Sequence, residues 1–516
     1  MRRSSSSLLL LFFLPPLALA LPHTPQTTAP EKRQYESPVT IDRAQAVIDA
    51  FRLSWDGYYK YAFPHDELHP VSNTFSDSRN GWGASAVDAL STALVMRQKD
   101  VVNQILEYIP TIDYTTTATE VSLFETTIRY LGGMISGYDL LSGPLADLAE
   151  NKSNIAALLT QSINLANTLS YAFDTPSGIP YNGLYLPTRS VNPSPNGLAT
   201  TGTLILEWTR LSDLTGNATY AFLAILAESY LLAPAPKWSE PWPGLLGTNI
   251  DVATGDFLDA EGGWVGGADS FYEYLIKMYI YDPERYALLR DRWILAADSS
   301  MEYLASKPLT RPDLAFIAAY NNRTVVKESQ HLACFSGGNF ILGGQVLGRQ
   351  DYIDFGLALV EGCRATYTST VTGIGPEIFG WDADKVPAGQ ESMFNASGFY
   401  ILNSGYQLRP EVIESYYYAY RATSDRKYQD WAWEAFVVIN QTTRVGSGFS
   451  SVRDVNKVGG GSKSNFMESF WFAEVLKYSY LIQTEGEEWQ VGGKGDGWVW
   501  NTEAHPFKVA GKGGRR

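Results

Sequence analysis

Apolar residues recur along most of the chain at the spacing of α-helices, and the helices come in a regular series. At four points a turn residue is followed by a tyrosine that begins a new helix-like segment: Tyr220, Tyr286, Tyr352 and Tyr428. These tyrosines are 66, 66 and 76 residues apart, a period that suits two helices and a long connecting loop. The helical pattern runs from about residue 40 to about 485, which corresponds to about 6.7 such units, and seven is the nearest whole number.

The helical segments are of two kinds. In residues 121–141 apolar side chains recur at three- and four-residue steps along one face, at Phe124, Ile128, Leu131, Ile135 and Tyr138. Residues 269–281 and 467–482 are instead apolar nearly all round, as expected of helices buried on every side. Inner helices buried all round and amphipathic outer helices predict an all-α fold, a closed α/α barrel. We expect strands only as short hairpins in its loops.

The N-terminus has the features of a secretory signal peptide. Residues 1–20 combine a basic start, an apolar stretch and the small-residue sequence Ala18-Leu19-Ala20, which predicts cleavage after residue 20. Pro15-Pro16 interrupts the apolar run and argues against a retained membrane anchor. No later stretch reaches the roughly 18 apolar residues of a membrane span, so none is expected in the mature chain.

The rest of the chain divides into three parts. Residues 21–34 are expected to be a propeptide or linker, with the dibasic pair Lys32-Arg33 as a second processing point. No low-complexity linker interrupts residues 35–500, so residues 35–508 are expected to form one domain. Residues 509–516 are expected to be a flexible tail.

Sequons and cysteines agree with passage through the secretory pathway. The only two cysteines, Cys334 and Cys363, are expected to form a disulfide in an oxidising compartment, and a catalytic cysteine is the less favoured interpretation. In the chain-entropy view, closing this loop adds roughly 3 kcal/mol of stability. Five N-glycosylation sequons occur, at Asn151, Asn217, Asn322, Asn395 and Asn440.

The net charge excludes one class of partner. At pH 7 the formal charge is −15, whereas nucleic-acid binding needs basic surface to meet the phosphates. A neutral ligand fits this balance better.

Acidic residues stand where very apolar helices begin. One such acid would be a simple cap that the helix dipole favours, but six that converge on a barrel axis would bury costly negative charge. Arg129 and Arg409 lie close in sequence to two of them and offset part of this charge, and a bound cation would offset more. The six acids are Glu125, Asp269, Glu273, Glu411, Glu414 and Glu468.

The C-terminal stretch "WNTEAHPFK" offers oxygen ligands for such a cation. Thr502 provides a hydroxyl and a carbonyl, which suit calcium. Zinc is not expected, because the five histidines show no ligand spacing apart from His65 and His69 in a proline-bounded loop. His505 is expected to be a packed, hydrogen-bonded residue of the core. Paired carboxyls together with abundant aromatic residues agree with sugar hydrolysis.

Several motifs together resemble glycoside hydrolase family 47, the class I α-1,2-mannosidases, and especially its secreted fungal members. The resemblance extends from about residue 40 to 508 and is highly specific as a set. The motifs are "HDELHPVS" (65–72), "GWGASAVDAL" (81–90), "FETTIRYLGG" (124–133), "ADSFYEYLIK" (268–277), "HLACF" (331–335), "LRPEVIES" (408–415), "MESFWFAEVLKY" (467–478) and "NTEAHP" (501–506).

This resemblance implies an (αα)7 barrel whose C-terminal hairpin plugs the barrel and carries calcium at Thr502. It implies an inverting hydrolase that removes terminal α-1,2-linked mannose from mannose-rich N-glycans. The general base would be Glu411 and the general acid Glu125 acting through a water, with Asp269 as the third essential acid. Which of Glu125 and Asp269 donates the proton is left open. An inverting site holds acid and base roughly 6.5–9.5 Å apart.

The resemblance also implies a set of binding residues, a cellular location and an oligomeric state. Glu377, Glu414, Glu468 and Glu503 would hold the waters of the ion. Arg129, Glu207, His331 and Arg409 match positions that line the sugar pocket, and Glu273 joins the binding set. The protein is expected to be a secreted monomer.

Two positions depart from the family pattern. Ser91 stands where many members have Asp, which puts a supporting contact in doubt. Gly267 stands where the endoplasmic-reticulum subgroup has Arg, which predicts that several mannoses are removed instead of one.

The rival interpretation is a lectin-like glycan-binding factor, and a barrel hydrolase for another glycan ranks below it.

Overall fold

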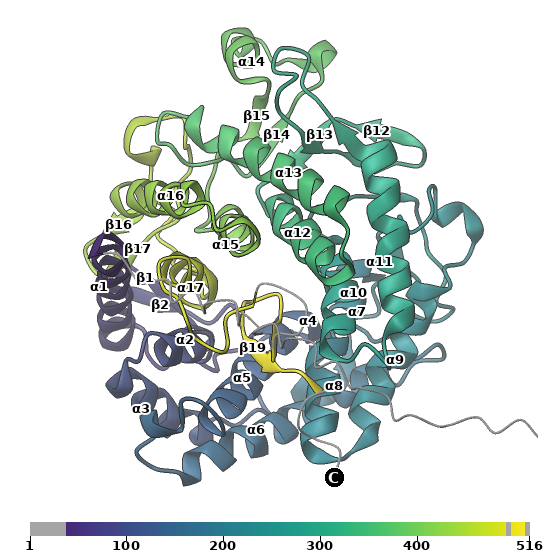
Figure 1. The fold of residues 1–516 in the computed structure, drawn as a ribbon. Coiled ribbons are helices and arrows are strands. Elements are labelled where there is room, and N and C mark those ends of the chain that lie inside the picture. The colour runs from purple at the N-terminus through teal and green to yellow at the C-terminus, as the bar shows by residue number, and fades with distance from the viewer. Residues whose placement is uncertain (1–37, 492–496, 511–516) are drawn as a thin grey trace, which may run out of the picture. The chain divides into compact units, whose positions relative to one another are not determined.

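Fourteen helices of the described residues form two concentric rings in this computed structural model (Figure 1). The structure describes residues 38–491 and 497–510, which belong to one compact unit, Glu36–Arg516. The expected signal peptide, the 21–34 segment and the tail beyond residue 510 lie outside the described residues.

The inner ring holds the helices that are buried on nearly all sides. Each packs on its neighbours in the ring, and α17 meets α2 to close it. The inner helices are α2 (Ala84–Val95), α5 (Gly132–Leu141), α8 (Ile205–Thr215), α10 (Asp269–Tyr281), α12 (Phe335–Leu347), α15 (Glu411–Thr423) and α17 (Leu476–Leu481).

The outer ring holds the helices that pair with them in sequence. The first of these, α1, packs on α17 and so pairs with the last inner helix. The four repeat tyrosines are buried at the starts of α9, α11, α13 and α16, so the period read from the sequence marks outer helices. The outer helices are α1 (Pro38–Tyr61), α3 (Lys99–Tyr108), α6 (Ser153–Leu169), α9 (Ala218–Leu232), α11 (Ala287–Ser299), α13 (Gln350–Thr368) and α16 (Lys427–Thr443). The described residues thus confirm the seven-hairpin α/α barrel.

One helix prediction was wrong. The segment 121–141 was expected to be amphipathic, but it is an inner helix buried on nearly all sides. It starts as α4 (Leu123–Thr126), widens into a π-helical turn at Thr127–Leu131 and continues as α5. The extra residue of a π turn shifts the helical register, so a constant period cannot describe this segment.

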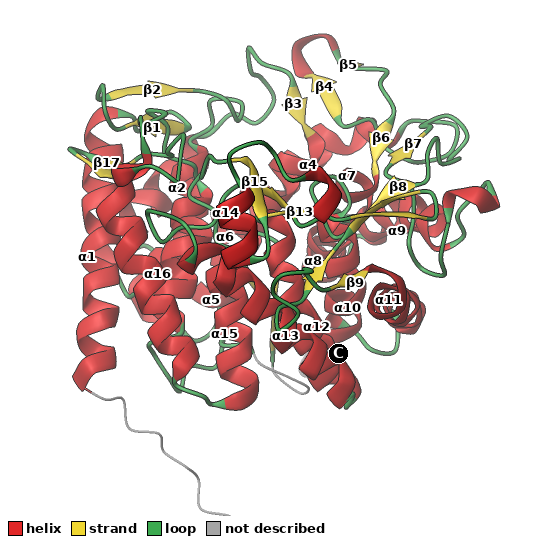
Figure 2. Cartoon of the chain, turned by 90° about the horizontal axis from the view of Figure 1, so that it is seen from above, coloured by secondary structure: helices red, strands yellow, loops and turns green. Residues whose placement is uncertain are grey.

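The two ends of the barrel differ, as Figure 2 shows. Short turns join the inner to the outer helices at one end, whereas long loops with short antiparallel strands and the helices α7 (Leu198–Gly202) and α14 (Glu391–Ser397) occupy the other, which we call the loop end. Within the described residues the strands are two to four residues long, as the scarcity of alternation predicted. They are β1 (Glu67–His69), β2 (Thr74–Ser76), β3 (Val121–Ser122), β4 (Gly183–Tyr185), β5 (Ser190–Val191), β6 (Asn196–Gly197), β7 (Asn249–Ile250), β8 (Glu261–Gly262), β9 (Ala305–Ser306), β10 (Phe316–Ile317), β11 (Ala319–Asn321), β12 (Thr324–Val326), β13 (Glu328–Gln330), β14 (Ile378–Gly380), β15 (Tyr400–Asn403), β16 (Arg444–Val445), β17 (Gly448–Phe449), β18 (Trp498–Trp500) and β19 (Pro506–Lys508).

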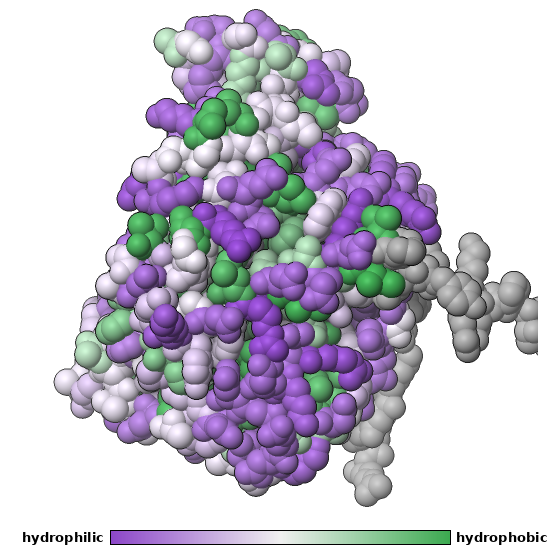
Figure 3. Space-filling model, turned by 90° about the vertical axis from the view of Figure 1, so that its left-hand side faces the viewer, coloured by the Kyte–Doolittle hydropathy of each residue, from purple (hydrophilic) through white to green (hydrophobic). Residues whose placement is uncertain are grey.

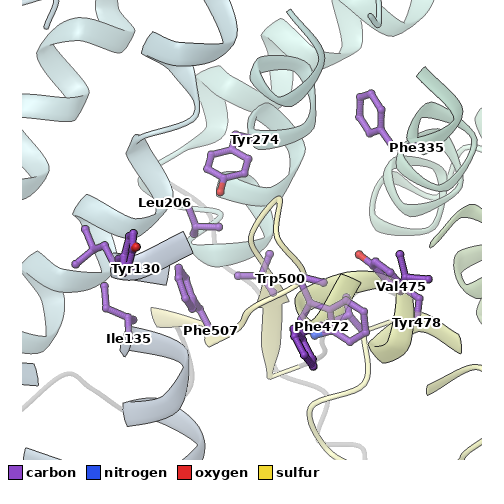
Figure 4. Packing of buried hydrophobic residues seen from close by; sticks show 14 of the residues in the cluster. Tyr130, Ile135, Leu206, Tyr274, Phe335, Phe472, Val475, Tyr478, Trp500 and Phe507 are labelled. Atoms are coloured by element: carbon purple, nitrogen blue, oxygen red, sulfur yellow. The ribbon is translucent and has the colours of Figure 1, made fainter. Parts of the chain in front are cut away.

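The C-terminal hairpin of β18 and β19 lies inside the inner ring (Figure 1). Its aromatic residues pack against the inner helices: Trp500 stacks on Tyr417 of α15 with ring centroids 5.1 Å apart, and Phe507 is fully buried. Figure 4 shows Phe507 beside Ile135 of α5 and Leu206 of α8, and Trp500 on the side of Phe472 and Tyr478. The hairpin therefore plugs the barrel, as the resemblance implied.

The disulfide, one face of the surface and the apolar character of the helices complete the description of the fold. Cys334 and Cys363 form the expected disulfide, which joins the start of the α12–α13 hairpin to its second helix. Figure 3 shows hydrophilic residues over much of the face near α1 and α16, with apolar residues in scattered groups. Among the described helices, none combines the length and apolar character needed to cross a bilayer.

Candidate active site

A cavity of about 330 Å³ opens where the inner helices begin, at the loop end of the barrel. Eight carboxyl side chains and three arginines line it, together with Thr502 and a few apolar residues. Asp269 and Glu411 are the first residues of α10 and α15, so successive hairpins each bring an acid to the same place. The acids are Glu125, Asp269, Glu273, Glu411, Glu414, Glu468, Glu474 and Glu503, and the arginines are Arg79, Arg129 and Arg409.

Glu125 and Arg129 form an ion pair on one side of the cavity. Ser122 caps α4 by accepting a hydrogen bond from the Glu125 amide, which fixes Glu125 in the first turn. Arg129 then reaches back one turn, with its Nε 2.9 Å and its Nη2 2.8 Å from Glu125 Oε2. Burial disfavours the charged carboxylate, but Arg129 and Arg79 outweigh it and hold the pKa of Glu125 below its ordinary value.

Glu411 faces a histidine on the other side. His331 Nδ1 lies 2.7 Å from Glu411 Oε2, and its Nε2 lies 2.8 Å from the Tyr367 hydroxyl, so both ring nitrogens are engaged. Despite the cost of burial, His331 and Arg409 lower the pKa of Glu411. The carboxylate is therefore ionised and ready to accept a proton.

Asp269 has the opposite environment. It accepts a 2.8 Å hydrogen bond from the Ser270 amide, and no cation pairs with it among the described residues. Burial raises its pKa to about 6. Asp269 thus keeps a proton under mildly acidic conditions where Glu125 and Glu411 have lost theirs.

The tip of the C-terminal hairpin, residues 501–505, forms the floor of the cavity. The Asn501 carboxamide oxygen accepts the amides of Glu503 and His505 at 3.0 and 2.8 Å, and its Nδ2 donates to the Ile128 carbonyl and to Glu207 Oε1, each at 2.9 Å. This buried asparagine therefore fixes the conformation of the hairpin tip and also attaches the tip to the surrounding inner helices.

Two buried lysines of the inner helices donate hydrogen bonds to the same tip. Lys277 Nζ donates to the Asn501 carbonyl at 3.3 Å, and Lys477 Nζ donates to the Ala504 carbonyl at 2.7 Å. Thr502 lies between them, and its hydroxyl donates to Glu273 Oε2 at 2.7 Å. These contacts present Thr502 and Glu503 of the stretch "WNTEAHPFK" to the cavity from its floor.

Ten of the predicted site residues line the cavity, and three lie behind its wall. Glu207 binds Asn501 and the Tyr274 hydroxyl, His331 supports Glu411, and Glu377 pairs with Arg409 Nε at 2.6 Å. The expectation that Glu207 and His331 line the pocket was therefore wrong, since the motifs identified buried supports as well as wall residues. The ten on the wall are Glu125, Arg129, Asp269, Glu273, Arg409, Glu411, Glu414, Glu468, Thr502 and Glu503.

Two charged wall residues were missed. Glu474 lies in the π-helical turn Trp471–Val475, within a run that reads as apolar core. Arg79 comes from the loop between β2 and α2. An acid inside the otherwise apolar "FWFAEVL" was the available signal for Glu474, whereas nothing in the sequence distinguished Arg79.

The structure shows the contacts of Ser91 and the position of Gly267, the two departures from the family pattern. Ser91 Oγ lies 2.8 Å from His505 Nδ1, so serine still contacts the hairpin tip at this position. His505 is fully buried packing, as expected, and burial lowers its pKa to about 4. Gly267 lines the cavity with a φ of 93°, a conformation that a side-chain-bearing residue rarely adopts.

Comparison with known proteins identifies close relatives. The sequence profile described as glycosyl hydrolase family 47 matches residues 50–509. The chain is 60% identical over 476 residues to the mannosyl-oligosaccharide alpha-1,2-mannosidase 1B of Aspergillus phoenicis, covering 92% of this chain and 93% of the relative. It is 59% identical over 471 residues to the mannosyl-oligosaccharide alpha-1,2-mannosidase of Penicillium citrinum, covering 91% and 92%. The solved structure of an alpha-1,2-mannosidase from Trichoderma reesei has a TM-score of 0.89 and 51% identity, covering 91% of this chain and 99% of that one.

Proposed function

Because the chain belongs to glycosyl hydrolase family 47, we propose that it removes terminal α-1,2-linked mannose from mannose-rich N-glycans with inversion of the anomeric carbon. One observation carries this proposal: a single cavity contains three acids whose pKa values are shifted in different directions. The pKa values of Glu411 and Glu125 are lowered, so both are ionised, whereas the pKa of Asp269 is raised. Inverting hydrolysis needs this asymmetry between a base and an acid.

In the proposed reaction Glu411 takes a proton from the attacking water, and His331 holds the carboxylate in place. The bond between the anomeric carbon and the glycosidic oxygen breaks, and that oxygen must receive a proton. Asp269 carries a proton near pH 6, whereas Glu125 would relay one through a water. The donor is identified by the variant, Asp269→Asn or Glu125→Gln, that abolishes the basic limb of the pH profile of kcat/KM.

The lining of the cavity suits a calcium ion. Eight carboxyls face three guanidinium groups, and Glu503 Oε2 is buried without a hydrogen-bond partner among the described residues. Hard cations prefer such oxygen donors. No three His, Cys, Asp or Glu side chains of the described residues converge tightly enough to hold an ion by themselves. We therefore propose that Thr502 provides the protein ligands and that Glu414, Glu468 and Glu503 hold waters around the ion. Glu474 of the cavity wall joins them, and Glu377 acts from behind the wall through Arg409.

When bound, calcium would supply positive charge and orient sugar hydroxyls. The residues of this chain do the rest. Arg129 orients Glu125 and Glu503, and the apolar side chains of Phe335 and Phe470 in the wall limit the access of water.

The proposal is tested by following mannose release from a mannose-rich N-glycan with and without a calcium chelator. We expect release that stops on chelation and returns when calcium is added. Glu411→Gln should lower kcat by roughly 10²–10⁴-fold, the usual contribution of a general base, while calcium still raises the melting temperature.

Other outcomes would contradict the proposal. Release that ignores the chelator would contradict the calcium site, and glycan binding without release would favour a lectin-like factor. In the same digest we expect several mannoses to be lost, because Gly267 leaves open the space that an arginine would fill; arrest after one mannose would contradict this.

We further propose that the protein is a secreted monomeric glycoprotein. Asn151, Asn217, Asn322 and Asn395 are exposed and can carry glycans. Asn440 is half-buried in α16, with its Oδ1 enclosed, so it is the least accessible of the five sequons.

A further inference from the structure

Arg79 is the most exposed of the three cavity arginines. The side chain of Arg79 is 29% exposed, against 5% for Arg129 and 16% for Arg409. Its Nε lies 3.5 Å from Glu125 Oε2, and its Nη1 has only long contacts, of 3.4 and 3.5 Å, to Ser78. Its Nη2 makes no hydrogen bond to the described residues. The guanidinium thus has N–H groups at the mouth of the cavity that make no short hydrogen bond to the described residues.

The loop that carries Arg79 is fixed by one buried carboxylate. Asp66 is fully buried, and its carboxylate accepts five hydrogen bonds. Its Oδ2 accepts the amides of Arg79 (2.8 Å) and Gly81 (2.7 Å), and its Oδ1 accepts the amides of Gly83 (2.9 Å) and Ala84 (3.0 Å) and the Tyr130 hydroxyl (2.8 Å).

Tyr130 closes this network, because its hydroxyl also lies 2.6 Å from the Arg79 carbonyl. Both backbone polar groups of Arg79 are therefore held, and Tyr130 belongs to the same π-helical turn as Arg129. The network ties the position of Arg79 to the helix that carries Glu125.

Exposure orders the cavity from floor to mouth. On the floor the Glu503 and Glu273 side chains are each 5% exposed, whereas Glu125 and Arg79 are 28% and 29% exposed. A terminal mannose that reaches Thr502 occupies the floor, so the next sugar of the glycan must leave past Glu125 and Arg79.

We propose that Arg79 binds hydroxyl groups of the sugar on the leaving-group side of the scissile bond, and that Asp66 positions it. This inference rests on the proposed function. Arginine suits the task because its planar fork donates two parallel hydrogen bonds, which lysine cannot reproduce. Arg79 is then a specificity residue for the second sugar, and the floor residues recognise the first.

The test compares Arg79→Met and Arg79→Lys on an α-1,2-linked mannose disaccharide. Losing hydrogen bonds from a charged donor should lower kcat/KM by roughly 10- to 100-fold in Arg79→Met. Inhibition by free mannose, which occupies only the floor, should change by less than about twofold. Arg290→Met on the outer helix α11 is the matched control and should equal the wild type, because Arg290 pairs with Asp291 and is not part of the cavity lining.

The lysine variant separates two roles of Arg79. Lysine keeps a positive charge beside Glu125 but lacks the fork, so we expect Arg79→Lys to retain most of the defect. Wild-type kcat/KM in Arg79→Lys would reduce Arg79 to a charge that serves Glu125 and would overturn the inference. So would a loss of mannose inhibition equal to the loss of kcat/KM.

Failure of the proposed function has a different signature. In that case the wild type itself would release no mannose from the disaccharide or from a glycan. If the wild type is active and Arg79→Met matches Arg290→Met, only the assignment of Arg79 is wrong.

The role of Asp66 is tested by a double-mutant cycle with Asp66→Asn, which keeps the shape but weakens the bonds to four amides. In the wild-type background we expect a loss of kcat/KM of about tenfold, and in the Arg79→Met background little further loss, because the residue it positions is gone. Equal losses in both backgrounds would show that Asp66 acts only on stability. Thermal unfolding of each variant verifies that it is folded.

Discussion

Glu411 and Asp269 both begin a buried helix, yet their neighbours give them opposite protonation. His331 contacts Glu411 directly and Arg409 lies at 3.9 Å, whereas Asp269 receives only hydrogen bonds from Ser270. Burial acts on both, and the adjacent cationic or hydrogen-bonding groups decide the sign of the pKa shift. Identical positions at helix starts therefore do not predict identical roles.

Ser91 gives a prediction at the scale of one residue. Its hydroxyl is the partner of the fully buried His505 Nδ1, so Ser91→Ala leaves a buried polar atom without a hydrogen bond. We expect the free energy of unfolding to fall by about 1–3 kcal/mol, measured by urea denaturation in saturating calcium. Ser91→Asp, the residue of many family members, should lose less; a larger loss than in Ser91→Ala would mean that the site cannot accept a charge.

The charged residues at helix starts could be predicted from sequence, and those held by other means could not. Glu125, Asp269 and Glu411 stood out because acids recur at the starts of several very apolar helices. Arg79 reaches the cavity only because Asp66 gathers the amides of its loop, and this requires the folded geometry. Roles of individual acids depend on neighbours from distant hairpins and were available only through the family resemblance.

At the scale of elements, the C-terminal hairpin depends on the space left by one glycine of α5. A Cβ built on Gly132 would lie 2.6 Å from Asn501 Nδ2 and 3.2 Å from His505 Cδ2. Helix propensity alone would favour alanine at this position by about 1 kcal/mol. The close approach of the hairpin tip therefore opposes the intrinsic preference of the helix.

We expect Gly132→Ala to displace the tip and with it Thr502. The midpoint calcium concentration for the rise in melting temperature should increase about tenfold or more, and stability should fall by about 1–3 kcal/mol. Gly137→Ala in the same helix is the control, because its Cβ would meet Leu90 and not the hairpin. It should change stability without changing the calcium midpoint; equal midpoints in both variants would disconnect Gly132 from the ion.

Buried inner helices were predictable where a segment is apolar on nearly all sides, because such a pattern does not depend on the register of the helix. The segments 269–281 and 467–482 were correctly read as buried inner helices. The segment 121–141 was misread because the π turn at Thr127–Leu131 breaks its register. A similar turn at Trp471–Val475 carries Glu474, and the apolar residues around it were read as helix core.

At the scale of the whole molecule, the repeat spacing predicted the architecture because each unit is one helical hairpin. The spacing cannot show how a ring closes. Here α1, the first helix, packs on α17 near the end of the chain, and the hairpin of β18 and β19 fills the centre. Both features rest on contacts between distant parts of the sequence, and only the family resemblance implied the second.

Global stability should depend on pH through Glu228 of the outer helix α9, which is buried and is not part of the cavity lining. Burial raises its pKa from 4.5 to about 8, and Arg292 only partly opposes this. Between about pH 5 and 8 the unfolded chain has released this proton and the folded chain retains it, so the contribution of Glu228 to stability falls as pH rises.

Glu228→Gln removes this titration. We expect the stability of the wild type relative to the variant to fall by about 2–4 kcal/mol from pH 5 to pH 8. Urea denaturation at both pH values, with calcium saturating throughout, measures the difference. A difference that stays constant, or that grows with pH, would contradict the raised pKa.

The order in which the chain leaves the ribosome gives the plugged barrel a last consequence. All seven inner helices emerge before the threonine and the glutamate of the hairpin tip, so a nascent chain already holds most of the acidic wall without its floor. We therefore expect a chain that ends before Asn501 to lack the floor of the cavity and to release no mannose, although it contains all seven inner helices. The hairpin tip is thus the last part of the cavity lining to be synthesised.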